Sequence, residues 1–174
     1  KNIDKISFGK AISSITTSVN EISIYGDQET VNKYSESYIP IEVDVAGLTD
    51  NKTYTVVVPK PEGIREVSEK TITVKISIGK EESKEVDDIK IDAINLGPNL
   101  KAGAIGENSS KTTVVVKGTK EVLDAIDSTT IKATVDLSGL GEGEHTVNVK
   151  VSGEEVKANY FAKTTKIKVR ITKS

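Results

Sequence analysis

The chain has 174 residues, and its 24 Lys and Arg side chains nearly balance 26 Asp and Glu, for a formal net charge of -2. This balance argues against a nucleic-acid-binding protein, which usually carries a basic surface, so we expect no nucleic-acid partner. The absence of cysteine excludes a disulfide framework and a thiolate metal site. No apolar stretch approaches the roughly 20 residues that span a bilayer, so we expect membrane attachment only through a segment outside this sequence.

The first half of the chain predicts short strands and one short helix. Residues 1–18 indicate an irregular strand pair, and the alternation from Val19 to Tyr25 predicts a half-buried strand that ends at Gly26. Residues 27–34 predict a helix with Asp27 as its N-cap. Residues 39–45 alternate apolar and polar side chains, which predicts another strand with Pro40 at a sheet edge. Strands are also predicted around Val56 and over residues 72–78.

The second half begins after a polar segment. Residues 79–88, GKEESKEVDD, predict a short, semi-rigid connector. Residues 89–105 are predicted to open the second module, with a turn over residues 95–99. A strand that ends at Gly118 precedes a short helix, whose N-cap position is held by Thr119. Period-two strands are then predicted over residues 131–137, 147–151 and 167–171.

One segment occurs twice in the chain. Residues 26–48 align with residues 118–140 without a gap, and the apolar side chains keep the same parity in both copies. Because a shift of one residue would move every strand side chain to the other face, shared parity indicates one fold formed twice. We therefore predict a mainly β protein with two tandem copies of a small β-rich module, at residues 1–80 and 84–174, each with one short helix. The residues expected to define this structural motif are Gly26, Asp44, Gly47 and Leu48, and in the second copy Gly118, Asp136, Gly139 and Leu140.

The candidates for chemistry favour structural roles. Asp44 and Asp136 are isolated from other carboxylates, and a local role as acceptors for turn amides fits them better than catalysis. The glycines at 139, 141 and 143 precede a predicted strand and not a helix, so they indicate a hairpin turn and not a phosphate-binding loop. His145 is the only histidine, which makes a metal site or a catalytic triad improbable. We predict no enzyme, with no catalytic, cofactor-binding or metal-binding residues. Asn51 and Asn108 begin glycosylation-type triplets, to which we assign no role.

The repeated segments resemble the YbbR-like domain family. The resemblance rests on a strand that ends in glycine (ISIYG and VVVKG), a short helix, and a strand with the pattern Val-Asp-x-x-Gly-Leu. It implies an extracytoplasmic array of modules that is anchored in the membrane by an N-terminal helix of the full-length protein. In Gram-positive bacteria such proteins resemble the regulator of the membrane diadenylate cyclase, which makes cyclic di-AMP. The implied partner is therefore a protein, the membrane diadenylate cyclase, and no family catalytic residues are carried over.

Three functions follow from these observations as hypotheses. The first is a non-enzymatic interaction and regulatory module that acts on a membrane diadenylate cyclase. The alternative is a structural cell-surface stalk or adhesin-type β-repeat, a class that sometimes contains Lys–Asn isopeptide crosslinks. An enzyme such as a wall hydrolase is disfavoured because paired carboxylates, a metal cluster and an activated nucleophile are all lacking.

Overall fold

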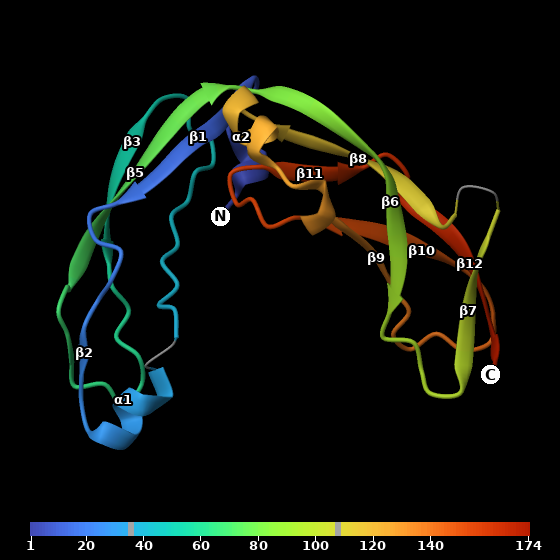
Figure 1. Ribbon diagram of the computed structural model, residues 1–174, viewed down its shortest axis with the longest axis horizontal. Helices are drawn as coiled ribbons and strands as arrows, with labels where there is room; N and C mark the ends of the chain where they lie inside the picture. Colours follow the sequence, from blue (N-terminus) through green and yellow to red (C-terminus); the bar gives the residue numbers. More distant parts are fainter. Residues whose placement is uncertain (35–36, 107–108) are drawn as a thin grey trace. The chain divides into compact units, whose positions relative to one another are not determined.

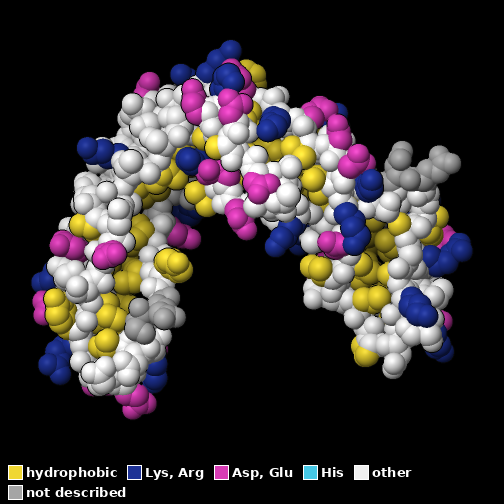
Figure 2. All heavy atoms as spheres, viewed as in Figure 1, with side chains coloured by type: hydrophobic (Ala, Val, Ile, Leu, Met, Phe, Trp, Pro, Cys, Tyr) yellow, Lys and Arg dark blue, Asp and Glu magenta, His cyan; other side chains and the backbone are white. Residues whose placement is uncertain are grey.

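The computed structural model describes residues 1–34, 37–106 and 109–174. The chain forms two compact units, Lys1–Lys80 and Glu81–Ser174. Both are mainly β, and each contains one short α-helix (Figure 1), so the predicted fold class is confirmed. Charged side chains of both signs are interspersed on the face of each unit that Figure 2 shows.

The first unit is built on a three-stranded antiparallel sheet. Its strands are β1 (Lys10–Thr17), β5 (Thr71–Lys80) and β3 (Lys52–Val57), in the order β1-β5-β3. A separate pair joins β2 (Ile24–Tyr25) to β4 (Glu66–Val67), and the 3-10 helix η1 (Ile3–Lys5) and the helix α1 (Gln28–Tyr34) complete the unit. Alternate side chains of β5 enter the core because successive strand residues point to opposite faces. These buried residues are Ile72, Val74 and Ile76.

The second unit contains a seven-stranded sheet in the order β11-β8-β6-β9-β10-β12-β7. Its elements in chain order are β6 (Glu82–Ile94), β7 (Leu100–Ile105), β8 (Lys111–Gly118), α2 (Lys120–Ala125), the 3-10 helix η2 (Ser128–Thr130), β9 (Lys132–Asp136), β10 (Gly143–Ser152), β11 (Asn159–Ala162) and β12 (Lys166–Lys173). Strand β6 pairs antiparallel with β8 and then parallel with β9. The core forms two clusters, one under α2 and one between β9, β10 and β12.

The two units share a three-stranded arrangement. The order β1-β5-β3 in the first unit corresponds to β7-β12-β10 in the second, and all these pairs are antiparallel. The register also agrees. Val56 lies opposite Ile72 in the first unit, as Val147 lies opposite Ile167 in the second. A common register places equivalent apolar side chains on the same face, which explains why β5 and β12 each bury one face.

Four predicted elements differ from the structure. Residues 1–18 do not form a strand pair of their own, because they contain the 3-10 helix η1 and the strand β1, whose partner is β5. Residues 79–88 are not a connector, because β5 continues to Lys80 and β6 begins at Glu82. Their side chains are mostly exposed, but backbone pairing with β8 holds β6 extended without an apolar period. The strand predicted from Val19 is limited to β2, because its partner β4 is equally short. Residues 39–45 form no assigned strand. Pro40 cannot donate a backbone hydrogen bond. In the second unit, the equivalent strand β9 pairs with β6, which comes before the repeated segment in the chain.

The two helices begin differently. Asp27 caps α1, because its Oδ1 accepts a hydrogen bond from the N–H of Thr30 at 3.0 Å and its Oδ2 accepts one from the Thr30 hydroxyl at 2.8 Å. Thr119 occupies the predicted N-cap position of α2, but its side chain makes no capping hydrogen bond. The Thr119 hydroxyl is buried and has no hydrogen-bond partner among the described residues. The second cap is therefore formed by the backbone alone, with the N–H of Leu123 donating to the carbonyl of Thr119.

This difference predicts an unusual result for Thr119→Val. Valine has nearly the same shape and removes the unpaired hydroxyl, so we expect the free energy of unfolding to stay constant or to rise by up to about 1–3 kcal/mol. Thr119→Ser keeps the hydroxyl but removes the methyl group, and it should destabilise the protein. Urea unfolding of both variants checks this. A clear loss of stability in Thr119→Val would show that the hydroxyl is paired after all.

Candidate functional site

The repeated Asp-x-x-Gly-Leu segment forms the same turn in both units. We call residues 44–48 and 136–140 the repeat turns. In the first, the carboxylate of Asp44 accepts a hydrogen bond from the N–H of Ala46 at 3.0 Å. In the second, the carboxylate of Asp136 accepts one from the N–H of Ser138 at 2.9 Å. Each aspartate therefore holds the backbone of its own turn, which is a common local use of this side chain.

The glycine and leucine of each turn complete it. Gly47 has φ of 69° and Gly139 has φ of 71°, in the left-handed region that glycine adopts without a steric cost. The N–H of Leu48 donates to the carbonyl of Val45 at 3.1 Å, and the N–H of Leu140 donates to that of Leu137 at 3.2 Å. Both leucines pack against the core of their unit. Each turn thus ends in a half-buried leucine that packs against the core.

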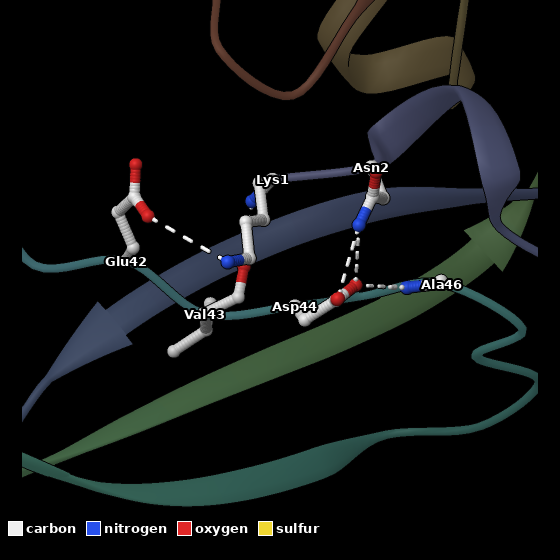
Figure 3. Close-up of polar contacts among 6 residues, drawn as sticks. All are labelled: Lys1, Asn2, Glu42, Val43, Asp44 and Ala46. Carbon is white, nitrogen blue, oxygen red and sulfur yellow. Dashed lines mark hydrogen bonds and ion pairs between the residues drawn. The ribbon is translucent and has the colours of Figure 1, made fainter.

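An asparagine from a distant part of the chain supports each aspartate. The Asn2 Nδ2 lies 3.0 Å from both carboxylate oxygens of Asp44 (Figure 3). In the second unit, the Asn95 Nδ2 lies 3.1 Å from Oδ1 of Asp136. Both asparagines have left-handed backbones, with φ of 62° and 59°. Each asparagine therefore joins a distant segment of its unit to the repeat turn.

These hydrogen bonds favour the ionised form of both aspartates. The Asn2 amide, followed by the N–H of Ala46, lowers the pKa of Asp44 below its ordinary value. The pKa of Asp136 is also lowered, first by the N–H of Ser138 and then by the Asn95 amide. A carboxylate with a lowered pKa is a poor general acid or base near neutral pH. The geometry favours a structural role over proton transfer.

This arrangement predicts acid sensitivity. The folded-state pKa values of Asp44 and Asp136 lie below the unfolded value of about 3.9, so their stabilisation is complete above that pH and disappears as the pH falls through the folded values. We expect the protein to lose stability between about pH 5 and about pH 2. In the variant with Asp44→Asn and Asp136→Asn, stability should change less over this range, although other aspartates with lowered pKa values keep part of the slope. Urea unfolding at several pH values measures both slopes, and equal slopes would exclude this role.

The remaining motif residues lie where strands lead into helices. Gly26 follows β2 and precedes α1, and a Cβ there would meet the carbonyl oxygen of Gly63 at 3.6 Å, an ordinary contact. Gly118 ends β8 and is buried against α2, where a Cβ would lie 3.2 Å from the Val122 Cγ1. Gly118 therefore allows α2 to approach β8 closely. At Gly26, in contrast, the available space would admit a Cβ atom.

The other candidates for chemistry have local partners. The Nε2 of His145 lies 2.9 Å from the carbonyl oxygen of Gly141, within the turn between β9 and β10. The glycines of this turn join two antiparallel strands, in agreement with a hairpin. Asn51 accepts a hydrogen bond from the N–H of Ile78 at 2.8 Å, and Asn108 lies outside the described residues. No group of three or more potential metal ligands occurs in the part of the chain that the structure describes.

Sequence reasoning missed Asn2 and Asn95. A weak signal existed, because each is followed by an aliphatic residue that enters the core, Ile3 in one unit and Leu96 in the other. These asparagines precede the repeat turns by 42 and 41 residues, and the repeated segment as aligned begins only at Gly26. An analysis of patterns over a few neighbouring residues could therefore not identify these asparagines as partners of the aspartates.

The sheets of both units present edge strands at the surface. The terminal strands of the two larger sheets are β1 and β3 in the first unit and β7 and β11 in the second. A shallow depression lies over β7 and β12, lined by Ala102, Gly103, Ala104 and Arg170. Over residues 1–34, 37–106 and 109–174, no helix is both long and apolar enough to cross a membrane.

Comparisons with known proteins agree with this architecture. The model of the YbbR-like protein family matches residues 1–76 and 89–171. The CdaA regulatory protein CdaR of Bacillus subtilis (strain 168) is 24% identical over 167 residues, which cover 95% of this chain. The chain spans only 34% of the length of that relative.

Two solved structures are also similar. A YbbR-like domain from Listeria monocytogenes has 15% identity and a TM-score of 0.46, over 53% of this chain and 95% of that domain. A YbbR-like protein from Streptococcus pneumoniae TIGR4 has 22% identity and a TM-score of 0.46, over 55% of this chain and 48% of that chain. The family match extends over most of both units. The chain belongs to the YbbR-like protein family.

Proposed function

We propose that the chain is a pair of non-enzymatic, extracytoplasmic interaction modules, residues 1–80 and 84–174, from a membrane-anchored regulator of a diadenylate cyclase. The observation that carries this proposal is the similarity to a CdaA regulatory protein over 95% of the chain. The repeat turns support it, because their aspartates are engaged in holding the backbone and have lowered pKa values. Such residues suit a scaffold better than a catalytic site.

The partner would bind along a sheet edge. A terminal strand presents backbone N–H and C=O groups that can pair with a strand from another protein. Strand β7 is the best candidate, because Gly103 has open space around it and the neighbouring side chains Ala102 and Ala104 are small. A flat edge with small side chains allows a second backbone to approach closely.

Deletion of residues 1–174 from the full-length protein tests the proposed function. We expect the cellular cyclic di-AMP concentration to change and co-purification of the cyclase to be lost. Unchanged cyclic di-AMP together with unchanged co-purification would reject the proposal. Intact mass tests the alternative of a crosslinked surface stalk, because each isopeptide bond would lower the mass by one ammonia.

A pair of glycine variants tests the edge. Gly103→Glu places a charge on β7, and Gly141→Glu places the same charge in the turn before β10. A Cβ would meet nothing within 4 Å at either position, so both variants should fold. Because charges on an edge strand oppose pairing, we expect Gly103→Glu to reduce co-purification of the cyclase and Gly141→Glu to leave it unchanged. Equal co-purification of the two variants would exclude β7 as the binding edge.

A further inference from the structure

Residues 39–45 of the first unit occupy the position that β9 occupies in the second. In the repeat, residues 40–44 correspond to β9, which lies between β10 and the parallel strand β6. The register of β6 and β9 places Ile91 opposite Ala133 and Ile94 opposite Asp136. Asn95 follows this strand directly and binds Asp136. In the second unit, the strand that leads into the asparagine is thus a structural partner of the repeat turn.

In the first unit, Lys1 makes backbone hydrogen bonds like those at the end of the β6–β9 pair. The amino group of Lys1 donates to the carbonyl of Val43 at 2.6 Å, and the N–H of Val45 donates to the carbonyl of Lys1 at 3.2 Å. The equivalent bond in the second unit runs from the N–H of Leu137 to the carbonyl of Ile94 at 2.9 Å. Lys1 therefore occupies the place of Ile94, immediately before the asparagine that binds the aspartate. Figure 3 shows this meeting of Lys1 and Asn2 with residues 42–46.

Burial differs between the two copies at the positions beside this strand. Ile131, Ala133 and Val135 are 6%, 1% and 2% exposed in the second unit. Their counterparts Ile39, Ile41 and Val43 are only half-buried, although they pack against the first core. In the second unit, the apolar side chains of β6 belong to the same clusters as β9, namely Ile89 beside Ile131 and Ile91 beside Val135. The side chains that are less buried in the first unit are therefore the counterparts of those that pack beside β6 in the second.

We infer that residues 39–45 accept one extended strand, parallel to them and joined directly to the nitrogen of Lys1. The added strand should resemble β6, with apolar side chains at alternate positions. Its register should be that of β6 against β9, with Lys1 in the place of Ile94. A peptide nitrogen at Lys1 keeps a hydrogen for Val43, so the observed hydrogen bond is compatible with a longer chain. This strand would cover the half-buried side chains and give the first unit the β6–β9 pairing that the second unit has.

The chain contains a suitable probe in its own β6. An extended variant carries a copy of residues 86–93, VDDIKIDA, immediately before Lys1, so that the copied Ile91 falls opposite Ile41. In a parallel pair, alternate residues of one strand direct their N–H groups to the same neighbour. Since Val45 already donates to Lys1, the N–H groups of Val43 and Ile41 should donate to the added strand. We expect amide hydrogen exchange at these two positions to slow by about tenfold or more, and the urea midpoint of the first unit to rise.

The matched control differs by one residue. A serine inserted between the copied segment and Lys1 keeps the sequence of that segment but moves its apolar side chains to the opposite face. We expect this slipped variant to exchange at Ile41 and Val43 at the rates of the unextended protein. Equal rates in the extended, slipped and unextended proteins would overturn the inference, and so would equal slowing by both extensions, which would indicate association without a defined register.

Two further outcomes also decide the inference. Amide resonances of Val114 and Val116 in β8 report whether the second unit keeps its own β6. If they change, the added strand has replaced β6 in the second unit, and the first unit does not hold the preferred position. If the copied isoleucines are replaced by serine and the protection at Val43 remains, apolar burial does not drive the pairing. The effect on hydrogen exchange is independent of the cyclase, so it stands or falls separately from the proposed function.

Discussion

Replacement of Leu137 by alanine is expected to destabilise the second unit by about 2–5 kcal/mol. Leu137 is part of the repeat turn, its side chain is 0% exposed, and it shares one cluster with Val147, Ile167 and Ile171. Its backbone is held on both sides, because its N–H donates to Ile94 and its carbonyl accepts from Leu140. The surroundings therefore cannot collapse easily into the space that the side chain leaves, which increases the cost of the cavity.

Urea unfolding, followed by amide resonances of the second unit, measures this loss. Val156→Ala is the matched control, because Val156 is 72% exposed and the truncation should change the free energy of unfolding by no more than about 0.5 kcal/mol. Since native domains are stable by only about 5–15 kcal/mol, the effect of Leu137→Ala should be evident. A loss similar to that of the control would mean that the repeat turn does not depend on the Leu137 side chain.

The second large effect is expected at Gly153. A Cβ at this position would lie 2.3 Å from Cζ and 2.5 Å from Cε1 of Tyr160. Real side chains do not approach this closely, so Gly153→Ala must displace the ring or the backbone, at a cost of about 1–3 kcal/mol. The ring of Tyr160 packs against the core under α2, and burial is the main cause of its raised pKa. We therefore expect both a lower stability and shifted Tyr160 ring resonances.

A double-mutant cycle separates the clash from a general effect of the added methyl group. Tyr160→Ala removes the ring, so adding Gly153→Ala to it should cost much less than Gly153→Ala alone. Gly141→Ala is the control for a glycine without close neighbours, since a Cβ there would meet nothing within 4 Å. Additive losses in the cycle would show that the substitution at Gly153 acts through the backbone and not through Tyr160.

The local patterns of the sequence predicted the short helices and the most regular strands. Asp27 was predicted as the N-cap of α1 from its residue type and position, and it caps that helix. The predicted alternation around Ile72 and Ile167 matches strands β5 and β12. These features depend on residues a few positions apart, which a repeat or a period reveals directly. The aspartates of the repeat turns belong to this class, because their backbone partners lie two residues further on.

Pairing between distant segments was decided only by the tertiary structure. Strand β6 is polar and mostly exposed, and it is extended because β8 and β9 pair with its backbone. Residues 39–45 show the converse case, since a strong apolar alternation gives no assigned strand there.

The residue pattern alone predicted that one β-rich module occurs twice, with a helix and an Asp-x-x-Gly-Leu turn in each copy. The tertiary structure decided which segments complete each copy, and it brought Asn2 to Asp44 and Asn95 to Asp136. The physical reason is that side-chain periodicity and caps act over a few residues. A β-strand, in contrast, needs hydrogen-bond partners that come from elsewhere in the chain.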